Sequence, residues 1–341
     1  MSSAIETHRD SRSSIANRIR ETDQGYIVGV LDLVLIAIFA LLISGFGSLD
    51  NAAAIASASA GLGVLALGQA IVVIGRGIDL SVVAIYGVTG QFVAQRLADG
   101  SPEWSALLAG LLMAIVFGCI NGLLVAFVEV PPLFVTLATS LAFIGLSRVI
   151  LFGGSISFKI GPDAKLIHAV GNNDVFGLPL ALFVWLGLAL VTWFFLARLV
   201  PGRMLYGIGD KPEAAALVGM PTRPLTLLTY VASAVLSFIA GLIIIGGAGS
   251  FDSRLLSNGS QLYDVLAIVV IGGVSLAGGR GTVEGVITAT ILIGILLNAM
   301  TLLDLDTVQQ SIFKAVIVIF ALILDRWLHP VDDETARSGE L

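Results

Sequence analysis

Long apolar runs, separated by short stretches rich in charge, proline or glycine, dominate the chain. The run from 27 to 46 is apolar at nearly every position, and about 20 such residues let one helix cross a bilayer. Ten runs follow one another, near 27–46, 52–74, 79–98, 104–127, 132–152, 179–198, 225–246, 262–277, 283–302 and 308–327. A transmembrane β-barrel would instead alternate polar and apolar positions. The pattern therefore predicts an all-α polytopic membrane protein with about ten transmembrane helices.

The composition agrees with this prediction. Hydrophobic residues make up 57% of the 341 residues and charged residues 12%, about half the charged share of soluble proteins, and the mean hydropathy is +0.98. The net charge of −6 comes without a run of Lys or Arg, so no nucleic-acid partner is expected. One cysteine and three scattered histidines suit neither an intramolecular disulfide nor a zinc site.

Basic residues in the loops predict the orientation in the membrane. An even number of spans places both termini on one side, and with that side inside, twelve of the 18 basic residues fall in inside segments and four outside. We therefore expect both termini in the cytoplasm. The predicted division is a disordered cytoplasmic tail over 1–25, a single transmembrane domain over 26–328 and a cytoplasmic tail over 329–341. Two loops are long, 153–178 outside and 199–224 inside.

Glycine interrupts the chain at two related places. The letters AIVVIG occur at 70–75 and again at 267–272, and glycine-rich stretches follow both, IGRGIDLSV and IGGVSLAGGRG. Glycine breaks at matching places in two halves of a transporter often mark broken helices near a substrate site. The repeat also hints at internal duplication. We expect broken or re-entrant helices here.

Polar residues within the apolar runs are the candidates for a solute path or gate, because each is costly in lipid and usually faces the bundle interior. They are Gln69, Asp79, Ser81, Asn121, Thr136, Thr139, Ser275 and Asn298. For any one of them, a hydrogen bond between helices is an equally good interpretation. Asp79 could cap the helix that follows it. Lys314 is near enough to the outer end of the last run to snorkel, or to pair with a helix-end carbonyl, and we favour both over contact with the solute.

The inside loop contains a short helical signal, DKPEAAALV over 210–218. Asp210 is placed to be its N-cap, with Pro212 in the first turn and Glu213 at N3, and Gly219 stops it. The helix is too short to span a membrane and has an apolar side. It therefore docks into a cytosolic subunit or packs on its own bundle.

Catalytic and nucleotide-binding motifs are missing from the sequence. The stretch Gly272–Gly285 (GGVSLAGGRGTVEG) lacks the Lys-Ser/Thr pair of a P-loop. No G-x-S-x-G motif and no His/Asp/Glu group with ligand spacing occurs. An enzyme is therefore not expected.

Five stretches of the sequence resemble the permease subunits of bacterial monosaccharide ABC importers, in the ribose/xylose/galactoside branch. The stretches are GRGIDLSVVAIYG at 75–87, NGLLVAFVEVPPLFVTLAT at 121–139, GRMLYGIGDKPEAAALVGM at 202–220, AIVVIGGVSLAGGRGTVEG at 267–285 and VQQSIFKAVIVIFALILDR near the C-terminal end. Their order and spacing cover roughly 60–327. Arg76 and Val83 stand where relatives usually have glycine.

The resemblance implies a multi-pass protein of the bacterial inner membrane that imports a sugar by alternating access. Its implied partners are a second permease subunit, two ATP-binding domains and an outside sugar-binding protein, beside membrane lipid. No cofactor is expected in this chain, because ATP and Mg would be bound by the partner ATPase. The residues implied for coupling to that ATPase are Gly209, Pro212, Glu213, Ala214, Ala215, Leu217 and Gly219.

Three alternatives remain open from the residues. One is an ABC permease for branched-chain amino acids or nucleosides, in which Arg148 or Lys314 would meet an amino-acid carboxylate. Another is an ion-coupled secondary transporter using Asp32, Asp79 or Asp264. A membrane-embedded enzyme is the third, although no grouping of catalytic residues in the sequence supports it.

Overall fold

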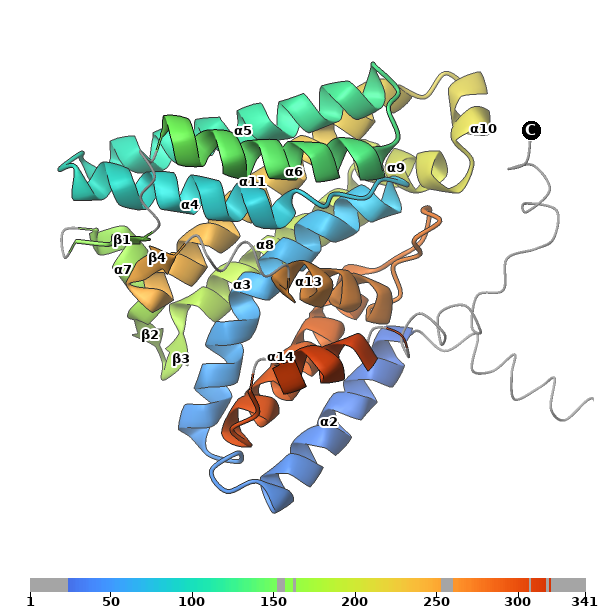
Figure 1. Ribbon diagram of the computed structural model, residues 1–341. Coiled ribbons are helices and arrows are strands. Elements are labelled where there is room, and N and C mark those ends of the chain that lie inside the picture. The colour runs from blue at the N-terminus through green and yellow to red at the C-terminus, as the bar shows by residue number, and fades with distance from the viewer. Residues whose placement is uncertain are drawn as a thin grey trace, which may run out of the picture.

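The computed structural model describes residues 24–151, 157–161, 164–252, 260–306, 308–316 and 319, and helices dominate it (Figure 1). The long helices are α2 (Gln24–Leu42), α3 (Leu49–Ile74), α4 (Val82–Ala98), α5 (Glu103–Ala126), α6 (Pro132–Ile150), α8 (Leu180–Arg198), α11 (Thr222–Ala248) and α14 (Val283–Leu302). Shorter helices are α7 (Lys165–Asn172), α9 (Val200–Asp210), α10 (Pro212–Leu217) and α13 (Ser260–Ile271). Residues 308–316 are also helical.

Two small antiparallel strand pairs complete the described structure. Strand β1 (Ser157–Lys159) pairs with β4 (Ser250–Asp252), and β2 (Asp174–Val175) pairs with β3 (Leu178–Pro179). Together with α7 they lie at one end of the bundle, and α9 and α10 lie at the opposite end (Figure 1). By the predicted topology, the end with α7 is outside and the end with α10 is inside.

The predicted helical membrane fold is confirmed, whereas the number of spans is not. Among the described residues, seven helices are long and apolar enough to cross a membrane, namely α2, α3, α5, α6, α8, α11 and α14. The predicted spans 79–98 and 262–277 are shorter, because α4 has 17 residues and α13 has 12. In both spans, the glycine-rich residues at the inner end are not helical. Half of the tenth run, 308–327, and nearly all of the two predicted tails lie outside the described residues.

Helices α3 and α11 form the centre of the bundle. The second half of α3, from Ser59 to Ile74, is buried at every position. Outer helices are apolar on the side that faces away from the bundle, as Leu41, Leu141 and Val149 illustrate, which suits contact with lipid. Small residues let the inner helices approach closely: a Cβ added at Gly118 of α5 would lie 2.8 Å from the backbone of α11.

The two glycine breaks have the same backbone structure. After α3 and after α13, three successive N–H groups bond to carbonyls four, three and five residues earlier, over Ile71–Gly77 and over Ile268–Val274. This is the Schellman pattern, which satisfies the last carbonyls of a helix. Its left-handed residue is Arg76 (φ 65°) in the first break and Gly273 (φ 76°) in the second. The repeated letters AIVVIG therefore correspond to a repeated structure.

We expect Gly118→Ala to lower the thermal stability of the detergent-solubilised protein, by about 1–3 kcal/mol, because the added methyl group overpacks the contact between α5 and α11. The matched control is Gly145→Ala in α6, where nothing lies within 4 Å of the added Cβ. Alanine favours a helix over glycine by up to about 1 kcal/mol, so the control should melt at or above the wild-type temperature. Thermal unfolding of both variants decides the point, and a Gly118→Ala variant as stable as the control would contradict this account of the packing.

Candidate functional site

Asp79 is the centre of a buried hydrogen-bond cluster between the first glycine break and α4. Its Oδ1 accepts hydrogen bonds from the backbone N–H of Ser81 (2.9 Å) and from the Ser81 hydroxyl (2.5 Å). Its Oδ2 accepts one from the hydroxyl of Ser233 on α11 (3.0 Å). All three side chains are fully buried. Asp79 thus shapes the turn that precedes α4, and Ser81 is the N-cap residue of that helix.

The same cluster extends to α5 and α6. The Asn121 amide donates to the Ser81 hydroxyl (2.7 Å), and the Thr139 hydroxyl donates to the Asn121 carbonyl oxygen (2.7 Å). Thr136 donates to the backbone carbonyl of Ile78 in the break (3.2 Å). The structure therefore brings together five of the eight residues that we considered for the path or gate. Ser233 also belongs to the cluster, although a single serine in an apolar helix gave no signal in the sequence.

The other three candidates lie elsewhere. Gln69 is fully buried in α3, and its amide has no hydrogen-bond partner among the described residues. Asn298 of α14 exchanges two amide hydrogen bonds, of 2.9 and 3.0 Å, with Asn51 of α3. Ser275 closes the turn of the second break, where its N–H donates to the Arg280 carbonyl (3.1 Å).

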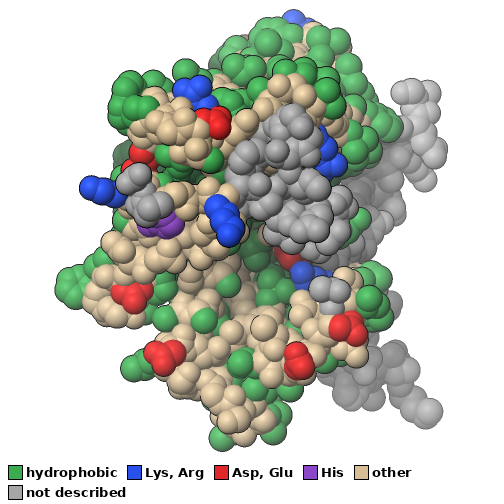
Figure 2. Space-filling model, turned by 60° about the vertical axis from the view of Figure 1, so that its left-hand side comes forward, with side chains coloured by type: hydrophobic (Ala, Val, Ile, Leu, Met, Phe, Trp, Pro, Cys, Tyr) green, Lys and Arg blue, Asp and Glu red, His purple; other side chains and the backbone are tan. Residues whose placement is uncertain are grey.

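A cavity of about 680 Å³ opens toward the end of the bundle that carries α7, and Figure 2 shows a hollow in this face with acidic and basic side chains around it. It is lined by Ala54, Ser57, Ala58, Gly61, Leu62, Gly171, Asn172, Ile243, Ile244, Gly247, Gln261, Asp264, Leu297 and Lys314. On α11, α13 and α14, each of these residues lies in the half of the helix nearer to that end, and on α3 they extend from that half to Leu62 at the helix midpoint. The inner half of α3 is sealed within the bundle.

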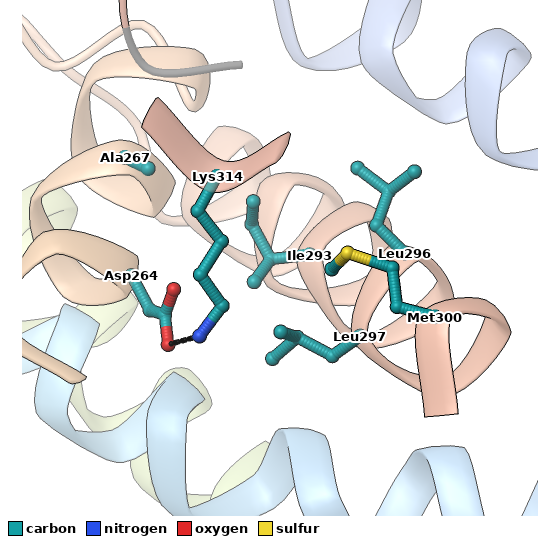
Figure 3. Close-up of a pocket in the computed structure, with 7 residues that line it drawn as sticks. All are labelled: Asp264, Ala267, Ile293, Leu296, Leu297, Met300 and Lys314. Atoms are coloured by element: carbon teal, nitrogen blue, oxygen red, sulfur yellow. Dashed lines mark hydrogen bonds and ion pairs between the residues drawn. The ribbon is translucent and has the colours of Figure 1, made fainter. Parts of the chain in front are cut away.

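An ion pair lies in the wall of this cavity. Lys314 Nζ is 2.9 Å from Asp264 Oδ2, and the two side chains are 18% and 5% exposed. Figure 3 shows the lysine extending from its helix toward the carboxylate on α13, beside apolar side chains of α14. Our expectation that Lys314 snorkels to the interface or pairs with a helix-end carbonyl is therefore wrong, because the side-chain carboxylate of Asp264 lies within its reach.

Two amides complete the polar part of the cavity wall. The Tyr86 hydroxyl donates to the side-chain oxygen of Gln261. The Asn172 amide donates to the Gly246 carbonyl (3.0 Å). Among the described residues, no group of three or more His, Cys, Asp or Glu side chains could hold a metal ion.

At the opposite end, α10 presents an exposed apolar surface. Its Ala215 is buried against Ile208 and Leu225, whereas Leu217 is 89% and Val218 73% exposed. Of the residues considered for coupling, Glu213, Ala214 and Gly219 are also exposed, and Pro212 is half-buried. Gly219 ends the helix in the left-handed conformation (φ 78°), with the Schellman pattern of hydrogen bonds.

Asp210 does not cap α10, contrary to the sequence prediction. It is the last residue of α9, and Lys211 takes the N-cap position of α10 without a side-chain hydrogen bond. The reason is that residues 200–210 continue as a helix right up to this point. The loop predicted at 199–224 is thus mostly helical.

Helix α9 connects α10 to both glycine breaks. The Gly279 N–H donates to the Ile74 carbonyl (2.9 Å), and this hydrogen bond joins the two breaks. Gly209 of α9 packs against the same carbonyl, since a Cβ added at Gly209 would lie 1.9 Å from its oxygen. The Tyr206 hydroxyl donates to the Gly281 carbonyl (2.9 Å). Burial, helped by the Glu284 carboxylate, raises the pKa of Tyr206, so this hydroxyl stays a donor at neutral pH.

Comparisons with known proteins identify the family of this chain. The family model of the branched-chain amino acid transport system permease component matches residues 51–322. The ribose import permease protein RbsC of Haemophilus influenzae is 30% identical over 87% of this chain and 91% of its own length. The fructose import permease protein FrcC of Rhizobium meliloti is 30% identical over 89% of this chain and 85% of its own.

A probable ABC transporter permease protein of Sinorhizobium fredii is 34% identical over 82% of both chains. No solved structure matches the chain. Because the family model and these relatives cover most of its length, the chain belongs to this family of transport-system permease components, and it is a multi-pass protein of the inner membrane.

Proposed function

We propose that this chain is the membrane-spanning subunit of an ABC importer that brings a monosaccharide into the cytoplasm by alternating access. The observation that carries the proposal is its likeness, over most of both chains, to import permeases named for ribose and for fructose. Its layout supports the proposal, because a solute-sized cavity opens at one end and an exposed short helix lies at the other. ATP and Mg²⁺ are bound and used by a separate partner chain.

The relatives favour a sugar over the branched-chain amino acids in the family's description. The cavity is compatible with a neutral cargo, since its cationic group, Lys314, is already paired with Asp264. An ion-coupled transporter would need a carboxylate free to bind a proton or sodium ion on the path. Asp79 and Asp264 are both held by hydrogen bonds. Asp32 is buried in α2, and its Oδ1 has no hydrogen-bond partner among the described residues, but α2 contributes no residue to the cavity wall.

The assembly consists of a second permease subunit, two ATP-binding domains and an extracytoplasmic sugar-binding protein. Helix α10 docks on the ATP-binding domain through its exposed Leu217 and Val218. Because α9 contacts both glycine breaks, movement of α10 reaches the inner ends of α3 and α13. The Asp79 cluster binds the first break to α5, α6 and α11, so inward opening must carry these helices with the break or open the cluster. We assign the cluster to the gate on this basis.

The test is reconstitution of the chain with its ATP-binding and sugar-binding partners in liposomes. We expect uptake of D-ribose or D-fructose that requires ATP and the binding protein. Uptake driven by a proton or sodium gradient without ATP would refute the proposal, and so would ATP-driven uptake of L-valine in place of either sugar.

Gly219→Val should lower ATP-driven import at least severalfold, because a branched side chain at a positive φ costs about 1–2 kcal/mol and distorts the end of α10. Nothing lies within 4 Å of a Cβ added here, so the effect comes from the backbone and not from a clash. Gly219→Asn is the matched control, since asparagine tolerates this conformation. Import rates and co-purification of the ATP-binding subunit are the measurements, and equal import by both variants would contradict the docking role.

Tyr206→Phe should reduce the sugar imported per ATP hydrolysed by about 2- to 10-fold, the range that corresponds to loss of one hydrogen bond of about 0.5–1.5 kcal/mol. The variant keeps the ring and its packing but cannot bind the Gly281 carbonyl. Tyr263→Phe, at an exposed position of α13, is the control and should behave as wild type. Uptake and ATP hydrolysis measured on the same liposomes give the ratio, and an unchanged ratio in Tyr206→Phe would exclude this connection.

A further inference from the structure

We infer that four side chains of the outer cavity, Asn172, Gln261, Asp264 and Lys314, form a weak binding site for the hydroxyl groups of the sugar in transit. We call this set the polar wall. All four line the cavity, and they come from α7, α13 and the helix of residues 308–316. The inference rests on the proposed function. It adds the place at which the permease contacts its cargo and the atoms that make the contact.

The polar wall offers both hydrogen-bond donors and acceptors. Lys314 has three N–H donors and its bond to Asp264 engages one, while Asp264 Oδ1 takes no part in that bond. The oxygen of Gln261 accepts from Tyr86, which leaves the amide N–H groups as its contribution. Asn172 donates to Gly246, so its side-chain oxygen is the complementary acceptor. A sugar hydroxyl both donates and accepts, and this mixture suits it.

The ion pair sets which class of solute the polar wall accepts. As a pair, Asp264 and Lys314 present no net charge, and a neutral solute can bind them without separating them. A zwitterionic amino acid would have to compete with the 2.9 Å contact between two side chains that are only 18% and 5% exposed. Separating a buried pair is costly, because each charge then lies in a poorly solvated place. The arrangement therefore favours a neutral polyol over an amino acid.

The remainder of the cavity suits the other face of a sugar ring. Ala54, Ala58 and Leu62 on α3 and Ile243 and Ile244 on α11 contribute apolar surface, against which C–H groups can pack. The cavity volume of about 680 Å³ lies in the range typical of small-molecule sites, about 300–1,000 Å³. Apart from Ser57 on α3, the polar side chains of the cavity belong to the polar wall, so the sugar is held loosely. Weak binding is what a transit site requires, since a tight site would retain the cargo.

The test uses thiol labelling inside the cavity of the assembled complex. Ala58, which lines the cavity and is exposed, is replaced by cysteine after the native thiol is removed as Cys119→Ser. The rate of modification by a methanethiosulfonate reagent is measured with and without D-ribose, D-fructose or L-valine at about 100 mM. A site with a Kd of about 10 mM would slow labelling about tenfold with the cargo sugar, whereas valine should have little effect.

The variants separate contact with sugar from a merely structural ion pair. The double variant Asp264→Leu/Lys314→Met removes both charges and both hydrogen-bonding groups. It should fold, because apolar residues of similar volume often replace a buried ion pair without loss of stability, and we expect protection to fall from about tenfold to about twofold. The control is Glu129→Gln, which removes the charge from the exposed contact between Arg223 and Glu129 (2.6 Å), neither of which lines the cavity. It should keep full protection.

Each outcome has one meaning. Protection by a sugar that the double variant loses and the control keeps supports the inference. No protection by either sugar, equal protection in the double variant, or protection by valine alone overturns it. ATP-driven uptake is measured on the same liposomes, so a polar wall that fails while ribose or fructose is still imported leaves the proposed function intact. Loss of uptake of both sugars by the otherwise unmodified complex would instead refute the proposed function.

Discussion

The structure depends on satisfying the backbone groups of helices that stop inside an apolar bundle. A helix end leaves four carbonyl groups without partners, and among apolar helices there is little water to bind them. Helices α3 and α13 solve this in the same way, with Schellman turns of identical spacing at Ile71–Gly77 and Ile268–Val274. The first break then gains a partner from the second, because Gly279 donates to the carbonyl of Ile74. The second break therefore satisfies a carbonyl group of the first.

Close approach of these backbones leaves no room for side chains. A Cβ at Gly209 would lie 1.9 Å from the Ile74 carbonyl oxygen, and one at Gly285 would lie 2.0 Å from that of Gly272. Glycine is therefore required here for space, more than for backbone freedom. The same closeness makes α9 and the two breaks one packed unit, in which a shift of one segment displaces its neighbours.

Local patterns in the sequence predict the long helices and the two breaks, but they do not predict which distant residues pair with one another. Apolar runs predict the long helices, and glycine predicts both breaks, because each signal lies within one segment. Asp79, Ser81, Asn121 and Thr139 are recognisable as polar residues in apolar surroundings, although their mutual bonds are not. The pair of Asp264 and Lys314 joins helices 50 residues apart, so neither residue alone indicates its partner.

Segments that lack a strong local pattern are also hard to predict. Helix α9 was expected as loop, because its VPGRMLYGIGD sequence begins with proline and glycine and is too short for a clear period. The pairing of β1 with β4 joins short strands about 90 residues apart along the chain, for which a three-residue sequence gives no signal. These missed elements lie at the two ends of the bundle, where tertiary contacts decide the conformation.

Helix α3 connects the two ends of the bundle, and its inner half is buried within the bundle. Gly61 and Leu62 line the outer cavity, and Ile74 bonds to the second break, about 20 Å further along at 1.5 Å per residue. Between them every residue is buried, so α3 cannot bend freely without disturbing several neighbours at once. A displacement at the breaks must therefore also shift residues at the cavity. Gln69 lies between the two, and its buried amide lacks a hydrogen-bond partner among the described residues. It is the residue in this part of α3 at which a rearrangement can add a hydrogen bond.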